Sequence, residues 1–178
     1  MSLPRATVFL DRDGVLNRRI MGDYVTCLDE FEVLPGVLEA LARLVKLDFR
    51  LAVVTNQRGI AIGRMTREDV AGVHGFLSRE VALTGGRLDE FYICPHDRHE
   101  GCDCRKPSPG LLDQAHAHRP IDWQRSWLIG DSDSDILAGK ARGVRTIKVV
   151  EPGEANADFD AVDLPAAVAL IENEVGKG

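Results

Sequence analysis

The sequence predicts an α/β fold: a doubly wound, Rossmann-like parallel sheet with helices on both faces. Five short apolar runs lack the alternation of polar and apolar positions, which is typical of strands buried on both faces. Helical patterns separate these runs, and strands that alternate with helices form parallel sheets. A chain of 178 residues corresponds to about one domain. We therefore expect a single domain over residues 1–178.

The predicted strands are short and rich in aliphatic residues. The first is Thr7-Val8-Phe9-Leu10, and the second is Leu51-Ala52-Val53-Val54. In chain order the five predicted strands cover residues 7–10, 51–54, 91–93, 127–129 and 146–150.

The predicted helices have apolar residues at helical spacing and recognisable end signals. Pro35-Gly36 precedes the first helix, and Thr66 with Asp69 three residues later resembles a capping box at the start of the second. Gly85-Gly86 ends that helix, and Gly143 ends the fourth. The predicted helices cover residues 37–47, 66–83, 110–118, 134–142 and 165–175.

Composition and missing motifs exclude several classes of protein. The net charge of -6 argues against a general nucleic-acid binder, which carries a basic excess. No apolar run approaches about 18 residues, so we expect no transmembrane helix and no membrane partner. The segment before the first strand is too short for a signal peptide, and we expect a cytoplasmic protein. The phosphate loop of nucleotide-binding proteins and the dinucleotide fingerprint are also absent.

Polar clusters follow four of the predicted strands directly. They begin at Asp11, Thr55, Cys94 and Gly130. In a parallel sheet the carboxyl ends of the strands lie at one edge, where ligands bind. The clusters are therefore expected to converge on one site.

The carboxylates of this site predict a bound cation. Like charges about 4 Å apart cost about 4 kcal/mol at an effective dielectric of about 20, so Asp11, Asp13 and Asp131 would repel one another. Hard oxygen ligands favour Mg²⁺. The alternative is a set of turn and helix-cap aspartates. A calcium loop starting at Asp131 fails, because its sixth position is Ile136 and its twelfth is Arg142.

A second cluster predicts zinc. Three thiols and an imidazole lie within eleven residues, as Cys94, His96, Cys102 and Cys104, and this donor set suits a tetrahedral, structural Zn²⁺. The predicted zinc loop covers residues 94–104 and would stiffen the chain that carries the next basic residues. His99 is an alternative ligand to His96. Disulfides or free core cysteines are the other interpretations, and a reducing compartment disfavours disulfides.

Four motifs resemble those of the haloacid dehalogenase-like phosphohydrolases. They are Asp11-x-Asp13-Gly14-Val15, Thr55-Asn56, Lys106-Pro107 and Gly130-Asp131-x-x-x-Asp135. The resemblance spans residues 8 to about 149. It implies a phosphatase in which Asp11 is the nucleophile, forming an aspartyl-phosphate, and Asp13 is the general acid and base.

The same resemblance implies the remaining roles. The Asp11 side chain, the Asp13 carbonyl and the Asp131 side chain would hold Mg²⁺, while Thr55 and Lys106 would stabilise the transferring phosphoryl group. Asp135 would either orient Lys106 or support the metal.

The zinc loop narrows the resemblance to two branches. Cys-x-His followed by Cys-x-Cys-Arg-Lys-Pro is similar to both the D-glycero-D-manno-heptose 1,7-bisphosphate phosphatases and the histidinol-phosphate phosphatases. The segment 17–36 is more similar to the heptose branch. We therefore expect hydrolysis of the C7 phosphate of the heptose bisphosphate, with histidinol phosphate or another small sugar phosphate as the alternative.

Neither gap between the motifs has room for a lid domain of about 50 residues or more, so we expect a capless protein that selects its substrate with loops. We also expect a monomer. Arginine suits a second phosphate because its guanidinium binds oxygens bidentately. The candidate substrate-binding residues are Arg12, Arg19, Asn56, Gln57, Arg58 and Arg105. Two other classes are less compatible with the motifs: a phosphate-binding regulatory module needs no nucleophile, and a zinc-dependent interaction protein needs no aspartates.

Overall fold

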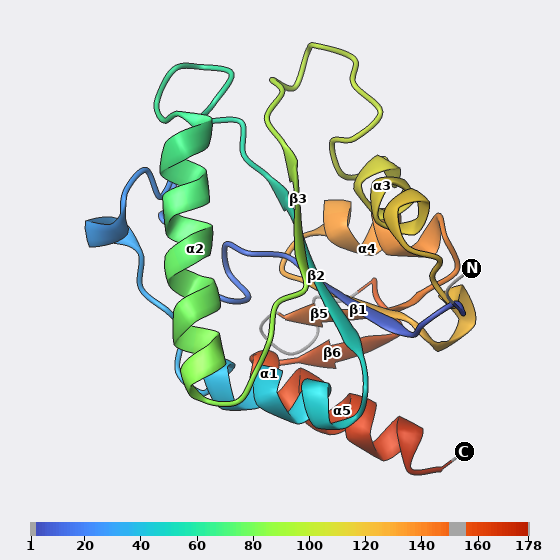
Figure 1. Ribbon diagram of the computed structural model, residues 1–178. Helices are drawn as coiled ribbons and strands as arrows, with labels where there is room; N and C mark the ends of the chain where they lie inside the picture. The colour runs from blue at the N-terminus through green and yellow to red at the C-terminus, as the bar shows by residue number, and fades with distance from the viewer. Residues whose placement is uncertain (1–2, 150–155, 178) are drawn as a thin grey trace.

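The computed structural model describes residues 3–149 and 156–177. All strands of its six-stranded sheet are parallel, in the order β3-β2-β1-β4-β5-β6 (Figure 1), which is the order of the Rossmann fold. The strands are β1 (Thr7–Leu10), β2 (Arg50–Asn56), β3 (Glu90–Cys94), β4 (Trp127–Gly130), β5 (Arg145–Val149) and β6 (Phe159–Ala161).

Helices cover both faces of the sheet (Figure 1). One face carries α1 (Val37–Lys46), α2 (Arg67–Leu83) and α5 (Leu164–Val175). The other carries α3 (Gly110–His118) and α4 (Asp133–Lys140). Two short 3-10 helices are η1 (Leu28–Glu30) and η2 (Trp123–Arg125). This two-sided arrangement confirms the predicted fold class.

The apolar strands contribute side chains to two separate cores, because successive side chains point to opposite faces of the sheet. Val8 and Leu10 of β1 belong to the core beneath α1, α2 and α5, whereas Phe9 belongs to the core beneath α3. All three side chains are fully buried. A continuous apolar run thus serves both faces at once, as the missing alternation predicted.

The five predicted strands and five predicted helices are present, with boundaries shifted by at most two residues. Thr66 and Asp69 form the predicted capping box at α2. The predicted strand 146–150 corresponds to β5, and Val150 lies outside the described residues. The prediction missed β6, which has only three residues, and Asp160 interrupts its apolar pattern. Pairing with β5, which is a tertiary interaction, makes this segment a strand.

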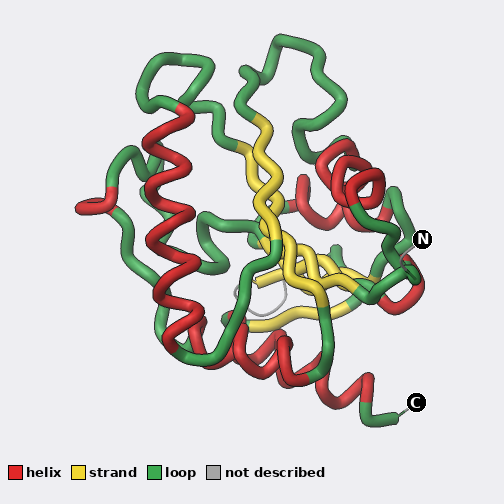
Figure 2. Tube along the Cα trace, viewed as in Figure 1, coloured by secondary structure: helices red, strands yellow, loops and turns green. Residues whose placement is uncertain are grey.

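The strand order places β1 between β2 and β4, so the segments after these three strands begin side by side. The loops after β2 and β3 project from the same end of the sheet (Figure 2). Between β1 and β2 the described chain contains η1 and α1, and between β2 and β3 it contains α2. No helix in the described part of the chain is long and apolar enough to cross a membrane.

Candidate active site

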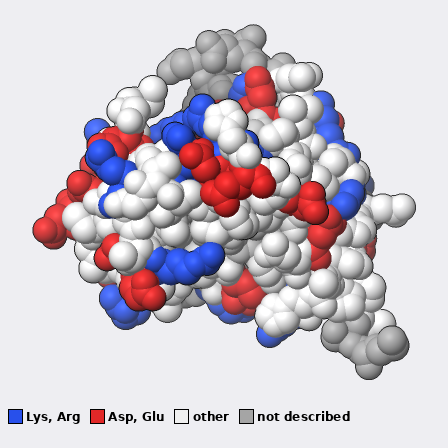
Figure 3. Space-filling model, turned by 90° about the horizontal axis from the view of Figure 1, so that it is seen from above, with Lys and Arg blue, Asp and Glu red and all other residues white. Residues whose placement is uncertain are grey.

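A cavity of about 410 Å³ opens at the carboxyl ends of the strands. Acidic and basic side chains lie next to one another on the face seen from above (Figure 3). The cavity is lined by Asp11, Asp13, Arg19, Ile20, Gly22, Asp23, Tyr24, Val25, Thr55, Asn56, Arg58, Arg98, Arg105, Lys106, Asp131, Ser132, Ser134 and Asp135. The four polar clusters therefore converge, as expected.

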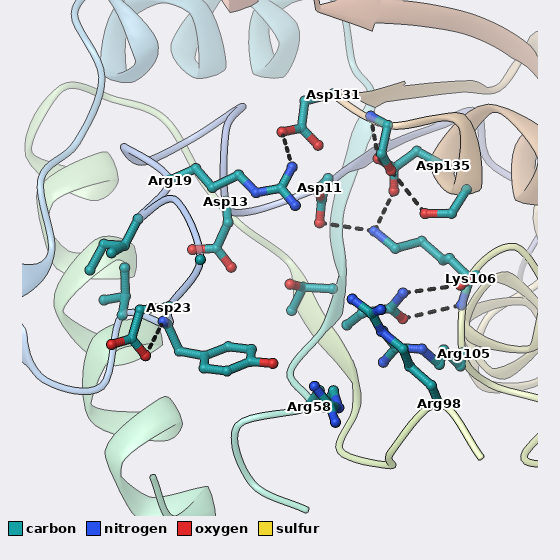
Figure 4. Close-up of a pocket in the computed structure, with 18 residues that line it drawn as sticks. Asp11, Asp13, Arg19, Asp23, Arg58, Arg98, Arg105, Lys106, Asp131 and Asp135 are labelled. Carbon is teal, nitrogen blue, oxygen red and sulfur yellow. Dashed lines mark hydrogen bonds and ion pairs between the residues drawn. The ribbon is translucent and has the colours of Figure 1, made fainter. Parts of the chain in front are cut away.

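Lys106 and Asp11 form the centre of the site (Figure 4). The Lys106 ammonium donates to an Asp11 oxygen at 2.9 Å and to the Val54 carbonyl at 2.7 Å, and it pairs with Asp135 at 2.5 Å. Its side chain is almost fully buried, and Asp11 is 9% exposed. Lys106 follows the Cys/His segment in sequence, so the fold brings this ammonium back to the end of β1.

Three carboxylates share this centre. One oxygen from each of Asp11, Asp131 and Asp135 lies within 4.8 Å of the others. Gly14 has φ +90, and a Cβ there would lie 2.2 Å from an Asp131 oxygen, so the close approach of the chain to Asp131 requires glycine.

The electrostatics of the centre fit a divalent cation. Burial and the negative charges of Asp135 and Asp131 raise the pKa of Asp11 to about 7, although Lys106 opposes the shift. Burial and Asp135 also raise the pKa of Asp131. The Lys106 ammonium and the Arg19 guanidinium therefore do not fully neutralise this set of carboxylates, and the carboxylate oxygens are ligands of the type that Mg²⁺ prefers.

Asp13 lies in a different environment from Asp11. Burial acts to raise its pKa, but the Arg12 charge and hydrogen bonds from Asn17, Arg12 and Gln57 together hold it below its ordinary value. Asn17 donates to one carboxylate oxygen at 3.0 Å and Gln57 to the other at 2.9 Å. Donors thus orient both oxygens.

The positions of Arg12 and Gln57 differ from the expectation that they touch substrate. Arg12 has no exposed surface, and Gln57 is 1% exposed. Neither lines the cavity. Both donate to Asp13 from behind, because each side chain faces the protein interior. A sequence motif does not show which way these side chains point.

The other predicted contact residues line the cavity. The Asn56 side chain donates to the main-chain carbonyl of Lys106 and accepts from its main-chain N–H, each at 3.1 Å. Arg19 donates to Asp131 at 3.0 Å, whereas its neighbour Arg18 pairs with Glu32 and points elsewhere.

Arg58, Arg98 and Arg105 lie across the cavity from Asp131 (Figure 4). Arg58 is tied to Asp97 at 2.6 Å, and Arg105 donates to the His96 carbonyl at 3.4 Å. The sequence prediction missed Arg98. Its position inside the predicted zinc loop was the available signal.

The separations within the Cys/His segment are compatible with a tetrahedral metal site. Two sulfurs, each about 2.3 Å from a tetrahedral zinc ion, would be about 3.8 Å apart. The Sγ atoms of Cys94 and Cys102 are 3.7 Å apart, and His96 Nδ1 lies 3.7 Å from Cys94 and 3.2 Å from Cys104. The sulfur separation is too long for a disulfide of about 2.05 Å.

The alternatives to this ligand set lie apart from it. His99 is exposed and does not belong to the group, and Cys27 is an exposed free thiol. Burial and the neighbouring thiols raise the pKa of Cys104 to about 12, so this thiol holds its proton in the absence of a cation. A bound metal displaces such protons. The pKa of Cys102 is lowered instead, because hydrogen bonds from the Arg105 main chain and the neighbouring thiols outweigh its burial.

Comparisons with known proteins agree with this geometry. A family model described as HAD-hydrolase-like matches residues 103–169. A Mycobacterium bovis protein named D-glycero-alpha-D-manno-heptose-1,7-bisphosphate 7-phosphatase is 39% identical over 95% of this chain and 94% of its own length. A Pseudomonas aeruginosa protein named as the corresponding beta-heptose phosphatase is 38% identical over 95% of this chain and 99% of its own length.

Solved structures show the same similarity. The D,D-heptose 1,7-bisphosphate phosphatase of B. bronchiseptica, crystallised with magnesium and phosphate, superposes with a TM-score of 0.87 at 30% identity. The match covers 95% of this chain and 99% of that one. The D,D-heptose 1,7-bisphosphate phosphatase of Burkholderia thailandensis gives a TM-score of 0.69 at 29% identity, covering 94% of this chain and 99% of that one.

Proposed function

Because this chain belongs to the heptose 1,7-bisphosphate phosphatase family of haloacid dehalogenase-like hydrolases, we propose that it hydrolyses the C7 phosphate of D-glycero-D-manno-heptose 1,7-bisphosphate. One observation carries the proposal most directly. A buried carboxylate paired with Lys106, a second carboxylate oriented by three donors, and a row of arginines face one cavity. That combination suits attack on one phosphate while another is held.

Asp11 and Asp13 divide the chemistry. An Asp11 oxygen attacks phosphorus, the bond from phosphorus to the C7 oxygen breaks, and Asp13 gives its proton to that oxygen. Water then attacks the aspartyl-phosphate, Asp13 takes a proton from it, and Asp11 is released with inorganic phosphate. The donors that lower the pKa of Asp13 favour its carboxylate, the form that takes the proton from the attacking water. An anionic phosphate ester bound beside Asp13 acts in the opposite direction and favours the protonated form that the leaving alcohol needs.

The surrounding residues orient the reacting groups and neutralise charge on the phosphate. Lys106 holds Asp11 and adds positive charge beside the phosphate, and Asp135 orients Lys106 through their ion pair. Thr55 accepts a hydrogen bond from Gln57 at 2.9 Å, which leaves its own hydroxyl proton free for a phosphate oxygen. The side chains of Asp11 and Asp131 and the carbonyl of Asp13 would hold Mg²⁺. When bound, the ion neutralises and aligns the phosphate.

The Cys94, His96, Cys102 and Cys104 cluster is proposed to hold a structural zinc ion, supported by its donor set and separations. Its role is to fix the loop from which Arg98, Arg105 and Lys106 project. With Arg58, the two loop arginines are proposed to bind the C1 phosphate. Arg58 and Arg105 were both expected to bind substrate, and Arg98 extends that set.

A phosphate-release assay with Mg²⁺ tests this function. The α and β anomers of heptose 1,7-bisphosphate are compared with histidinol phosphate, because relatives named for either anomer are about equally similar to this chain. We expect kcat/KM for one anomer to exceed that for histidinol phosphate by about tenfold or more. The reason is that histidinol phosphate lacks the second phosphate, and a hydrogen bond to a charged group contributes about 1.5–3 kcal/mol. A preference for histidinol phosphate would overturn the substrate assignment, and no release from any phosphate ester would overturn the reaction.

A further inference from the structure

Behind Asp13 lies a buried chain of polar contacts, of which the proposed mechanism uses only the contact between Arg12 and Asp13. Arg12 Nη2 donates to both Asp13 oxygens at 2.9 and 3.0 Å, while Arg12 Nη1 lies 3.4 Å from His74 Nε2. Arginine has no acceptor, so His74 must accept with an unprotonated Nε2. The chain therefore runs from His74 through Arg12 to the proposed general acid.

The surroundings of His74 keep it in this acceptor state. The residue is 5% exposed on α2, and its ring stacks on Phe91 with centroids 4.3 Å apart and 17° between the planes. Burial and the adjacent Arg12 charge lower the pKa of His74 to about 3. At neutral pH the ring is uncharged and carries its proton on Nδ1.

Arg12 depends on this contact more than most buried arginines would. Its Nε is buried without a hydrogen-bond partner among the described residues. Among residues 3–149 and 156–177, Asp13 and His74 are thus the only hydrogen-bond partners of the guanidinium. Without an acceptor at position 74, one edge of the guanidinium loses its only partner, and its alignment on Asp13 rests on Nη2 alone.

We propose that His74 is a positioning residue that locks Arg12, and through it Asp13, for proton transfer to the leaving alcohol. The proposal rests on the phosphatase function proposed above. Its effect is expected wherever Asp13 transfers a proton, and transfer of the phosphoryl group from an alkyl leaving group isolates the first of these steps. It differs from a general packing role, which would disturb Asp11 and the whole cavity together.

Two variants separate these roles. H74F keeps an aromatic ring against Phe91 and removes the acceptor, whereas H74Q keeps an acceptor and removes the ring. Single-turnover rates are measured with an alkyl phosphate, the heptose bisphosphate or a simple phosphate monoester, and with p-nitrophenyl phosphate. The p-nitrophenolate ion leaves without a proton, so its release does not need Asp13 as an acid.

We expect H74F to slow transfer from the alkyl phosphate by about tenfold, a part of the 10²–10⁴-fold that acid–base catalysis typically supplies. The p-nitrophenol burst should stay within about twofold of wild type, and H74Q should recover most of the alkyl rate. Equal slowing with both substrates, no slowing, or no recovery in H74Q would overturn the proposal. If H74F does not fold, H74L serves as the acceptor-free variant.

The simple monoester keeps the two proposals separable. A wild-type enzyme that cleaves it but not the heptose bisphosphate would contradict the substrate assignment and leave the His74 comparison measurable. If the wild-type enzyme cleaves the bisphosphate and H74F is slowed by the same factor on both substrate types, only the role of His74 is contradicted.

Discussion

The two sides of the cavity are built in different ways. The reacting side takes Asp11, Thr55 and Asp131 from the first positions after buried strands or from a strand end, and its groups are mostly buried. The arginine side takes Arg98 and Arg105 from a long loop that contains no regular secondary structure. Groups that form and break bonds need fixed geometry, which strands supply. Groups that recognise a second phosphate can come from a loop with its own anchor.

Lys106 joins the two sides. Its main chain is clamped by Asn56 just after the Cys/His cluster, while its ammonium reaches Asp11. A change in the loop anchor should therefore affect recognition first and chemistry second. Variants on the reacting side should therefore lose more activity than variants on the arginine side.

Asp11→Asn should remove the chemistry and leave recognition. We expect kcat to fall by roughly 10³-fold or more, because the amide is a poor nucleophile, while the circular dichroism spectrum and substrate binding persist. Turnover above about 1% of wild type would contradict the nucleophile assignment.

Cys104→Ser should disturb the arginine side. We expect loss of the proposed zinc by metal analysis and a fall in kcat/KM for the bisphosphate of about 10- to 100-fold, the range typical of damaged metal sites. Proteolysis within residues 95–105 should also become faster. Cys27→Ser is the matched control and should keep both zinc content and activity, and an unchanged zinc content in Cys104→Ser would contradict the ligand set.

Arg105→Ala should raise KM for the bisphosphate by about tenfold, because a hydrogen bond to a charged group contributes about 1.5–3 kcal/mol. KM for a monophosphate and kcat for either substrate should change little. Arg18→Ala is the control, since Arg18 pairs with Glu32 outside the cavity. Equal effects of Arg105→Ala on both substrates would show that it does not bind the second phosphate.

The reacting side should also limit stability in metal-free protein. The pKa of Asp11 is raised from an ordinary 3.8 to about 7, so the folded state binds its proton more tightly than the unfolded state. The resulting contribution to the free energy of unfolding is fully present below about pH 4 and is lost as the pH rises through about 7.

Asp11→Asn removes the charge, so its Tm should exceed that of wild type by about 3 °C or more at pH 8 without metal. The gain should vanish at pH 4, and Mg²⁺ should raise the Tm of wild type more than that of the variant. Asp29→Asn, at an exposed position, is the control. A lower Tm for Asp11→Asn at pH 8 would contradict the repulsion inferred at this centre.

Local patterns were sufficient where local chemistry decides structure. Thr66 and Asp69 cap α2 as predicted, because a capping box depends only on residues three apart. The Cys/His cluster could be predicted from the sequence for the same reason, because its four potential metal-binding side chains lie within eleven residues. β6 could not be predicted from the sequence, since its three residues become a strand only through pairing with β5.

The sequence by itself determined the strand–helix alternation, the polar clusters after the strands and the zinc-type donor set, because each depends on short-range spacing. Only the tertiary structure decided which side chains reach the cavity. It turned Arg12 and Gln57 inward to Asp13, separated Arg19 from Arg18, brought in Arg98 and paired Asp135 with Lys106. The physical reason is that a side chain's direction depends on the packing of distant segments around it, and a motif records only which residue occupies each position.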